Sequence, residues 1–290
     1  MGATGNTGRP AVERLLALGE KVRVLGRSAE RLKPLVAAGA EARVGDPSDP
    51  VFLSQALQGS EAVSVLIPPD YQNPDVLGYY DRVGAAAEQA IRRNRIRRLT
   101  FLSSLGAELS EGTGPIAGLG RQELRLSGLG ADVLLLRPGY FYENFYGSIP
   151  MIRHHGVNGG GVAPDVPITM TAARDVGVVI ADALHLRDWT GTSVRELPGP
   201  RDYTMTETTS LIGRAIGKPD LKYVQFPDAD FAKGLVQAGF SEAAARLFVE
   251  MAHALSTGKV HLLEERGPKN TMPTSFESWV EGFGRAYQKS

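Results

Sequence analysis

Three glycines near the start of the chain have a spacing that could bind a phosphate group. The segment from Gly2 to Gly8 reads GATGNTG, a G-x-x-G-x-x-G pattern, and runs directly into a predicted helix. Glycine permits a tight turn and a close approach of the backbone to a pyrophosphate, while the first N–H groups of a helix carry partial positive charge. A glycine-rich tail would show the same letters, but here a helix and then a strand follow, as in a dinucleotide-binding motif. The sequence therefore predicts that this turn binds a dinucleotide.

A basic residue occupies the position about twenty residues further on, where such a motif contacts the ribose. An NAD-preferring site has Asp or Glu there, whereas this chain has Gly26-Arg27, with Arg31 and Lys33 close behind. A guanidinium can form a bidentate pair with a 2′-phosphate. We therefore expect NADP(H), with NAD(H) less favoured, and Arg27 at the 2′-phosphate. The alternative is that Arg27 only caps a solvated loop.

An acidic residue follows the next predicted strand, in Val44-Gly45-Asp46. Asp46 is placed to accept a hydrogen bond from the adenine amine. An Asx turn or a helix cap ahead of Pro47 accounts for an aspartate there equally well. Both interpretations of Asp46 stay open.

The elements that must position these groups alternate along the N-terminal half. Short apolar runs are separated by longer helical stretches, which is typical of a parallel sheet with crossover helices. The predicted strands cover residues 21–25, 41–44, 62–67, 98–103 and 132–136. The predicted helices cover residues 11–18, 29–38, 50–57, 76–94 and 117–126. This order indicates an α/β fold with a doubly wound parallel sheet of the Rossmann type.

One strand of that fold is missing from the pattern. The dinucleotide-binding motif follows a strand, but only Met1 precedes the first glycine. In a doubly wound sheet this strand is central, so its loss leaves buried backbone groups unpaired, each at a cost on the order of 1 to 3 kcal/mol. We therefore expect an apolar strand of about five residues upstream of Met1.

The composition of the sequence and its pattern of predicted elements change after Gly139. We predict an NAD(P)-binding domain over residues 1–145 and a smaller, mostly helical substrate-side subdomain over residues 146–290. The second half starts with a segment rich in Gly and Pro, and a strand near 194–197 is expected to return to the sheet. Further helices are predicted over residues 174–186, 242–256 and 275–287.

The composition favours small molecules as binding partners. The chain has 32 basic and 32 acidic residues, so no overall charge attracts nucleic acid or a membrane surface. It has no cysteine, which suits a reducing compartment, and no apolar run long enough to span a bilayer. The basic run from Arg92 to Arg98 fits a helix end, and His154-His155 lacks a third metal ligand. We therefore expect a cytoplasmic protein without metal, nucleic acid or membrane partners.

Several segments resemble one known family. GATGNTGRP at the start, VRVLGR, LQGSEAVSVLIP, RLTFLSSLGA and above all LLLRPGYFYENF are similar to the NmrA-like group of atypical short-chain dehydrogenases. The closing stretch from Met272 to Trp279 also resembles the start of the family's C-terminal helix. This group includes NADPH-dependent quinone or enone reductases and redox-sensing regulators that bind the dinucleotide without turnover. The resemblance covers nearly the whole chain.

The resemblance implies a set of site residues. Those expected around the pyrophosphate are Gly2, Gly5, Asn6, Thr7 and Gly8, with Arg27 at the adenosine phosphate. Those expected along the cofactor groove and near the nicotinamide are Ile67, Pro68, Ser103 and Ser104. Tyr140, Phe141 and Asn144 are expected on the substrate side, with Tyr140 also in contact with the cofactor, and the catalytic candidates are Tyr140, Asn144 and Ser103. The aromatic set from Tyr140 to Tyr146 is interpreted as the edge of a flat apolar pocket, with a plain core as the alternative.

The chain departs from the reductase pattern in its proton donors. No tyrosine has a lysine four residues later, the spacing that acidifies the hydroxyl in ordinary short-chain dehydrogenases. The segment from Ile116 to Arg121, where related proteins place His or Lys, also offers no donor. This argues against carbonyl reduction and sugar epimerisation but leaves hydride transfer to a quinone or enone. The alternative is a dinucleotide-sensing regulator with a protein partner, and a homodimer stays open in either case.

Overall fold

Two parallel sheets form the N-terminal half. The computed structural model describes residues 1–290. One sheet has the order β3-β4-β5-β9, all parallel, and the other is the parallel pair β1-β2. The strands are β1 (Arg23–Gly26), β2 (Glu41–Val44), β3 (Ala62–Val65), β4 (Arg98–Leu102), β5 (Asp132–Pro138) and β9 (Thr192–Leu197). The predicted doubly wound α/β fold is confirmed.

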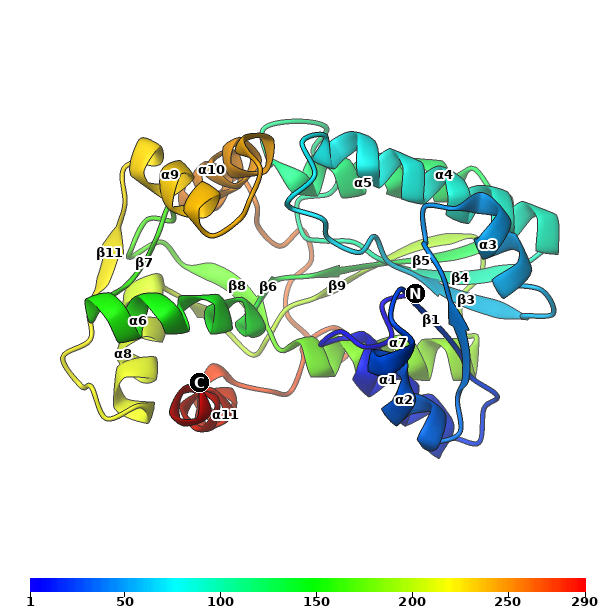
Figure 1. The fold of residues 1–290 in the computed structure, drawn as a ribbon, viewed down its shortest axis with the longest axis horizontal. Coiled ribbons are helices and arrows are strands. Elements are labelled where there is room, and N and C mark those ends of the chain that lie inside the picture. Colours follow the sequence, from blue (N-terminus) through cyan, green and yellow to red (C-terminus); the bar gives the residue numbers. More distant parts are fainter.

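Helices cover both faces of these strands (Figure 1). On one face lie α3 (Pro50–Ala56), α4 (Val76–Asn94) and α5 (Pro115–Ser127), and on the other α1 (Gly8–Ala17), α2 (Ala29–Ala37) and α7 (Ala173–Leu186). Side chains of β5 alternate between the two layers: Val133 and Leu135 join the core under α4, while Leu134 and Leu136 join the core beside α7. Burial on both faces explains why β5 is continuously apolar.

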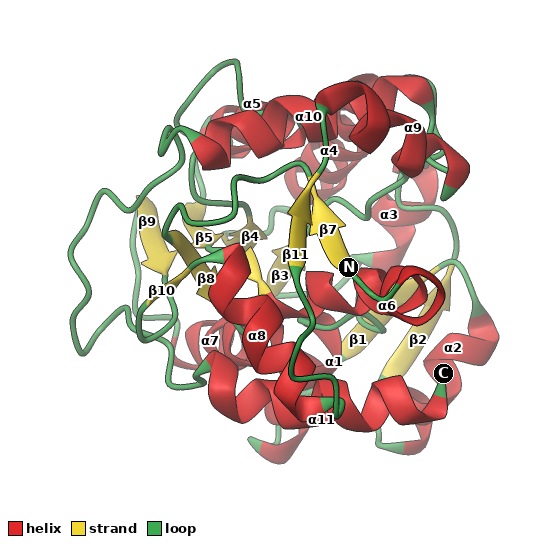
Figure 2. Ribbon diagram, turned by 90° about the vertical axis from the view of Figure 1, so that its left-hand side faces the viewer, coloured by secondary structure: helices red, strands yellow, loops and turns green.

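The C-terminal half adds short strands and a second group of helices. The strands are β6 (Tyr140–Phe141), β7 (Asn158–Gly160), β8 (Ile168–Thr171), β10 (Asp202–Tyr203) and β11 (Tyr223–Gln225). The helices are η1 (Tyr142–Ser148), α6 (Ile149–His155), α8 (Met205–Ala215), α9 (Asp228–Gln237), α10 (Glu242–Ser256) and α11 (Phe276–Lys289). Figure 2 shows α9 and α10 above the β7–β11 pair and α8 and α11 below it.

Helix α10 connects the two halves. Its first turn contributes Ala244 to the core of the four-stranded sheet, and its last turns contribute Ala252 and Leu255 to the C-terminal core. The second half also reaches back: β9 pairs with β5 along six residues, and α7 packs against α1, where a Cβ on Gly177 would lie 2.4 Å from the Thr7 carbonyl oxygen. A domain boundary at residue 145 therefore stays a prediction.

Most element ends differ from their predicted positions by one to three residues. The ranges of β2, α4 and α10 coincide with the predicted ranges. Helix α1 begins at Gly8, three residues before the predicted start, and β3 ends at Val65, before Ile67. The short strands β6, β7, β8, β10 and β11 were not predicted. No helix is long and apolar enough to cross a membrane, and no group of three or more acidic or histidine side chains is placed to hold a metal ion.

Candidate dinucleotide site

The predicted phosphate turn leaves backbone donors free. The Gly5 N–H donates to the Gly2 carbonyl across 3.0 Å and closes the turn, and the next bonds start at Arg9 and Ala11. The N–H groups of Asn6, Thr7 and Gly8 have no acceptor within the chain. Thr7 caps α1 without a side-chain hydrogen bond, so its hydroxyl does not take these donors. Free N–H groups at a helix N-terminus are the arrangement that binds a pyrophosphate.

Two of the glycines cannot be replaced without distorting this turn. Gly2 has a φ of +67°, and a Cβ there would lie 2.5 Å from a methyl carbon of Leu66. A Cβ on Gly8 would lie 2.1 Å from the Gly2 carbonyl oxygen. Gly5 is less constrained, since its nearest contact would be 3.3 Å. The close approach at Gly8 lets α1 begin directly under the turn, as the predicted roles of these glycines require.

Arg27 follows the last residue of β1 and is exposed, with no ion pair or hydrogen bond to another side chain. It lies near Tyr79 of α4, whose pKa is raised, mainly by burial. The charges of Arg27 and Asp46 act on this hydroxyl in opposite directions. Asp46 accepts a hydrogen bond from the Ser48 N–H at 2.9 Å, so the Asx turn is observed. Arg27 is thus the cation available to a phosphate here.

The carboxyl ends of β3, β4 and β5 lie at one edge of the sheet, because the three strands are parallel. After β3, Ile67 is buried and Pro68 is half-buried. After β4, the Ser103 N–H donates to Leu136 at 2.8 Å, and the buried Ser103 hydroxyl has no partner. The Ser104 hydroxyl instead donates to the Leu105 carbonyl at 3.0 Å. Ser103 is therefore the serine with hydrogen-bonding capacity left for a ligand.

Tyr140 and Asn144 lie after β5. Burial raises the pKa of Tyr140 to about 12, and a hydrogen bond with the exposed Asn144 opposes this shift in part. A hydroxyl with a raised pKa is a weak proton donor at neutral pH. Tyr140 can therefore orient a ligand, but it lacks the acidity of a catalytic tyrosine.

The aromatic set is mostly core, which corrects the pocket interpretation. Tyr142 is fully buried and packs edge-on against Tyr203 and Phe276, and Phe145 also packs against Phe276. Phe141 packs into the core beside α7. Tyr140 and Tyr146 are partly buried and pack against the same C-terminal core as Tyr142 and Phe145.

An aromatic cluster that the sequence analysis missed lies after β3. Tyr71 stacks on Phe240 at 5.1 Å and meets Phe248 edge-on at 4.9 Å. Ser241 fastens this contact, because its N–H donates to the Tyr71 carbonyl at 2.8 Å and its hydroxyl to Asn73 at 2.7 Å. The connection between α9 and α10 is thereby attached to the β3–α4 loop. The sequence signal for this cluster was the proline-rich segment IPPDYQNP, which predicts an ordered loop at the carboxyl edge of the sheet.

No proton donor appears at the start of α5. Arg121 lies 3.3 Å from Asp81 and is therefore directed towards α4. Gly120 packs tightly under the preceding loop, since a Cβ there would lie 2.1 Å from the Ala107 carbonyl. That loop is held by Arg137 of β5, which pairs with Glu108 at 2.8 Å and with the buried Glu123 at 2.6 Å. The start of α5 thus offers no acidic side chain as a proton donor.

These features define a nucleotide-binding protein, and comparison with known families agrees. A family model described as NAD(P)H-binding matches residues 2–185, more than half of the chain. The chain therefore belongs to this family, and the predicted NAD(P)H cofactor is confirmed.

Individual relatives share the fold along nearly the whole chain. Quinone oxidoreductase 2 of Escherichia coli (strain K12) is 26% identical over 269 residues, covering 89% of this chain and 87% of that protein. The structure of the E. coli NADPH-dependent quinone oxidoreductase complexed with NADPH has a TM-score of 0.82 at 23% identity, covering 97% and 98% of the two chains. Triphenylmethane reductase of Citrobacter sp. with NADP(H) gives 0.79 at 18% identity, with 98% of each chain covered.

The predicted resemblance to NmrA-like proteins is also confirmed at the level of the fold. NmrA, a negative transcriptional regulator whose structure was determined with NAD, has a TM-score of 0.68 at 16% identity, covering 99% of this chain and 94% of that chain.

Proposed function

We propose that this protein is an NADPH-dependent oxidoreductase that passes hydride to a small, flat electrophile such as a quinone or enone. One observation carries the proposal: the free N–H groups at Gly8, the unpaired cation Arg27 and the unpartnered Ser103 hydroxyl follow one edge of the parallel strands. A dinucleotide laid along this edge would find a partner for each polar portion.

The preference for NADPH rests on Arg27. Its guanidinium is exposed, lacks an internal acceptor and follows the strand at which the adenosine ribose is contacted. The carboxylate nearby, Asp46, is engaged with the Ser48 N–H. The site therefore offers an unpaired positive charge to a 2′-phosphate.

The substrate class follows from the missing acid. When bound, the cofactor supplies the hydride, and the chain's residues hold donor and acceptor together. Tyr140 is a weak acid because its pKa is raised, and Arg121 is ion-paired with Asp81. Neither side chain is therefore a strong proton donor. A quinone needs none, because the hydroquinone anion formed by hydride addition takes its proton from water. Positioning alone can supply several kcal/mol of rate enhancement.

The same absence supports a second candidate, a dinucleotide sensor without turnover. Such a protein would distinguish the oxidised from the reduced cofactor and transmit the difference to a protein partner. The fold similarity to NmrA keeps this candidate in view.

One experiment separates the two functions. Purified protein is mixed with NADPH or NADH and a panel of benzoquinones, naphthoquinones and cyclic enones, and absorbance at the nicotinamide band is followed. We expect NADPH oxidation with at least one quinone and a slower rate with NADH. Cofactor binding by calorimetry without any oxidation across the panel would reject the reductase and favour the sensor.

A further inference from the structure

One segment of the C-terminal half contacts both loops that follow β3 and β4. It covers residues 240–260, which include all of α10, and we call it the α10 segment. On the β3 side it forms the aromatic cluster with Tyr71. On the β4 side the Lys259 ammonium donates to the Glu111 carbonyl at 2.9 Å, and a Cβ on Gly114 would lie 2.0 Å from a backbone oxygen of α10. The α10 segment therefore touches both loops that flank the proposed position of the nicotinamide.

Ser241 makes the polar contacts between the α10 segment and the β3–α4 loop. Its N–H donates to the Tyr71 carbonyl at 2.8 Å, and its hydroxyl donates to the Asn73 carbonyl at 2.7 Å. The same hydroxyl accepts the Ala244 N–H at 3.1 Å and so caps the start of α10. A helix cap needs only the acceptor side of a hydroxyl. The hydroxyl proton is therefore available to the loop, and one side chain fixes both the helix start and the loop.

The β3–α4 loop connects this attachment to the proposed dinucleotide groove. Its first residues, Ile67 and Pro68, are those expected along the groove, and Tyr71 follows three residues later. Short-range hydrogen bonds order the loop, because the Asn73 side-chain oxygen accepts the Asp75 N–H at 2.9 Å and Asp75 in turn caps α4. A ligand that restricts the start of this loop therefore also restricts the carbonyls to which Ser241 is bonded.

Helix α9 has no buried residue and is held mainly at its ends. At its start, Asp228 contacts His253 of α10 at 2.8 Å, and both side chains are exposed. At its other end, Gly239 has a φ of +95° and turns the chain directly before the α10 segment. Figure 1 shows α9 next to α10. An element with few buried contacts opens readily, so the placement of α9 depends on these attachments.

We infer that Ser241 is a positioning residue that couples occupancy of the dinucleotide site to the placement of α9 and α10. The inference rests on the dinucleotide lying along the carboxyl edge of the sheet, as proposed above. A bound dinucleotide holds the β3–α4 loop, so the Tyr71 carbonyl stays in place for the Ser241 N–H. Coupling of this kind is reciprocal, so the attachment also favours the loop conformation that binds the cofactor. Met251 of α10 packs against the same core as Tyr140, so the coupling extends to the expected substrate side.

Amide hydrogen exchange of the full chain, with and without saturating NADPH, tests the inference. We expect NADPH to slow exchange at the Ser241 amide roughly tenfold, because its acceptor is held in place. In Ser241→Ala this protection should fall below about threefold, and calorimetry should show NADPH affinity reduced by about threefold to fivefold. Binding of NADPH by the wild type without any slowing at Ser241 would overturn the inference, and this measurement requires no variant to fold.

Two further variants separate coupling from helix capping. Ser275 caps α11 by accepting the Ser278 N–H at 3.2 Å but bonds neither loop of the dinucleotide site. Ser275→Ala should therefore leave the protection at Ser241 and the NADPH affinity unchanged, whereas Ser241→Thr, which keeps a hydroxyl and a competent cap, should restore both. Equal effects of Ser241→Ala and Ser275→Ala would overturn the inference. Protection by NADPH without quinone reduction would reject the reductase and retain the coupling, so the two proposals fail separately.

Discussion

At the scale of single residues, Arg27 is the group whose removal should change cofactor choice most clearly. Its guanidinium is exposed and has no partner in the protein. We expect Arg27→Ala to weaken NADPH binding by about tenfold, the value of one solvent-exposed charge-assisted bond. NADH binding should change little, because it lacks the 2′-phosphate. Titration calorimetry with both cofactors measures the ratio.

A matched control for Arg27 lies on α10. Arg246 is an exposed arginine that pairs with Glu242 across 3.6 Å. Arg246→Ala should leave the affinities for both dinucleotides unchanged. An equal loss of NADPH and NADH affinity in Arg27→Ala would mean that the side chain supports the local fold and does not bind the 2′-phosphate.

The role of a residue could be predicted from the sequence where backbone geometry determines the residue type, and less well elsewhere. The turn from Gly2 to Gly8 was foreseeable, because its glycines have spacing that a bound phosphate requires. For Asp46 the sequence left two interpretations, and the hydrogen bond to Ser48 shows the Asx turn. Tyr142 could not be assigned, because a core and a pocket edge are both lined by aromatics and only packing separates them.

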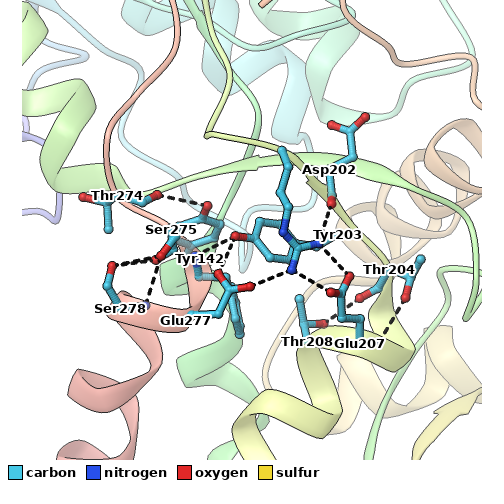
Figure 3. A network of polar contacts seen from close by, with 12 residues as sticks. Tyr142, Asp202, Tyr203, Thr204, Glu207, Thr208, Thr274, Ser275, Glu277 and Ser278 are labelled. Atoms are coloured by element: carbon cyan, nitrogen blue, oxygen red, sulfur yellow. Dashed lines mark hydrogen bonds and ion pairs between the residues drawn. The ribbon is translucent and has the colours of Figure 1, made fainter.

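At the scale of elements, a polar network attaches α11 to α8 (Figure 3). The Tyr203 hydroxyl accepts the first N–H of α11 from Phe276 at 3.0 Å and donates to Glu277 at 2.8 Å. Arg201 lies over the Tyr203 ring at 3.9 Å and bonds Glu277 and Glu207, each at 2.6 Å. The network fixes the start of a helix that contributes Phe276 to the C-terminal core.

The network predicts an acid-dependent contribution to stability. Partial burial acts to raise the pKa of Glu277, but the hydrogen bonds from Arg201 and Tyr203 help to outweigh it and lower that pKa. The stabilisation is therefore present above the ordinary glutamate pKa of about 4.3 and is lost as the pH falls through the lowered value. We expect Glu277→Gln to reduce Tm at pH 7 by about 2 to 4 °C, since the pair is exposed to solvent.

Thermal melts at pH 7 and at a series of lower pH values check this expectation. The difference between wild type and Glu277→Gln should shrink as the pH falls through the lowered pKa of Glu277, because the wild-type carboxylate becomes protonated there. Glu281→Gln serves as the control, since Glu281 is exposed on the same helix and forms no ion pair. A difference that stays the same throughout the pH series would show that Glu277 acts through packing.

Elements with strong periodicity were predictable, and those defined by partners were not. Helix α4 shows the predicted range because its apolar stripe and its Asp75 cap are encoded locally. Strands such as β6 and β10 are two residues long and exist only because β8 pairs with both. No window of sequence contains that information.

At the scale of the whole molecule, α10 and β5 should make the two halves unfold together. The chain has two tryptophans, and each lies in a different core: Trp189 beside α7 and Trp279 in the C-terminal core. Variants with Trp189→Phe or Trp279→Phe therefore give separate fluorescence reporters. We expect their urea midpoints to differ only by the small shift in stability that each substitution causes. Calorimetry of each variant, with a ratio of calorimetric to van't Hoff enthalpy near one, is the companion measurement.

Clearly different urea midpoints for the two fluorescence reporters would contradict this coupling. It would show that the α10 contacts through Ala244 and Ala252 are too few to make the halves cooperative. Such a result would support two independent domains with a boundary near residue 145.

A dinucleotide at the proposed site would also affect the stability of the fold. Arg27 follows β1, while Ser103 and Tyr140 follow β4 and β5, so the proposed ligand would contact elements that are far apart in the sequence. Occupancy and folding are then thermodynamically linked, worth about 2.7 kcal/mol at a ligand concentration one hundred times Kd.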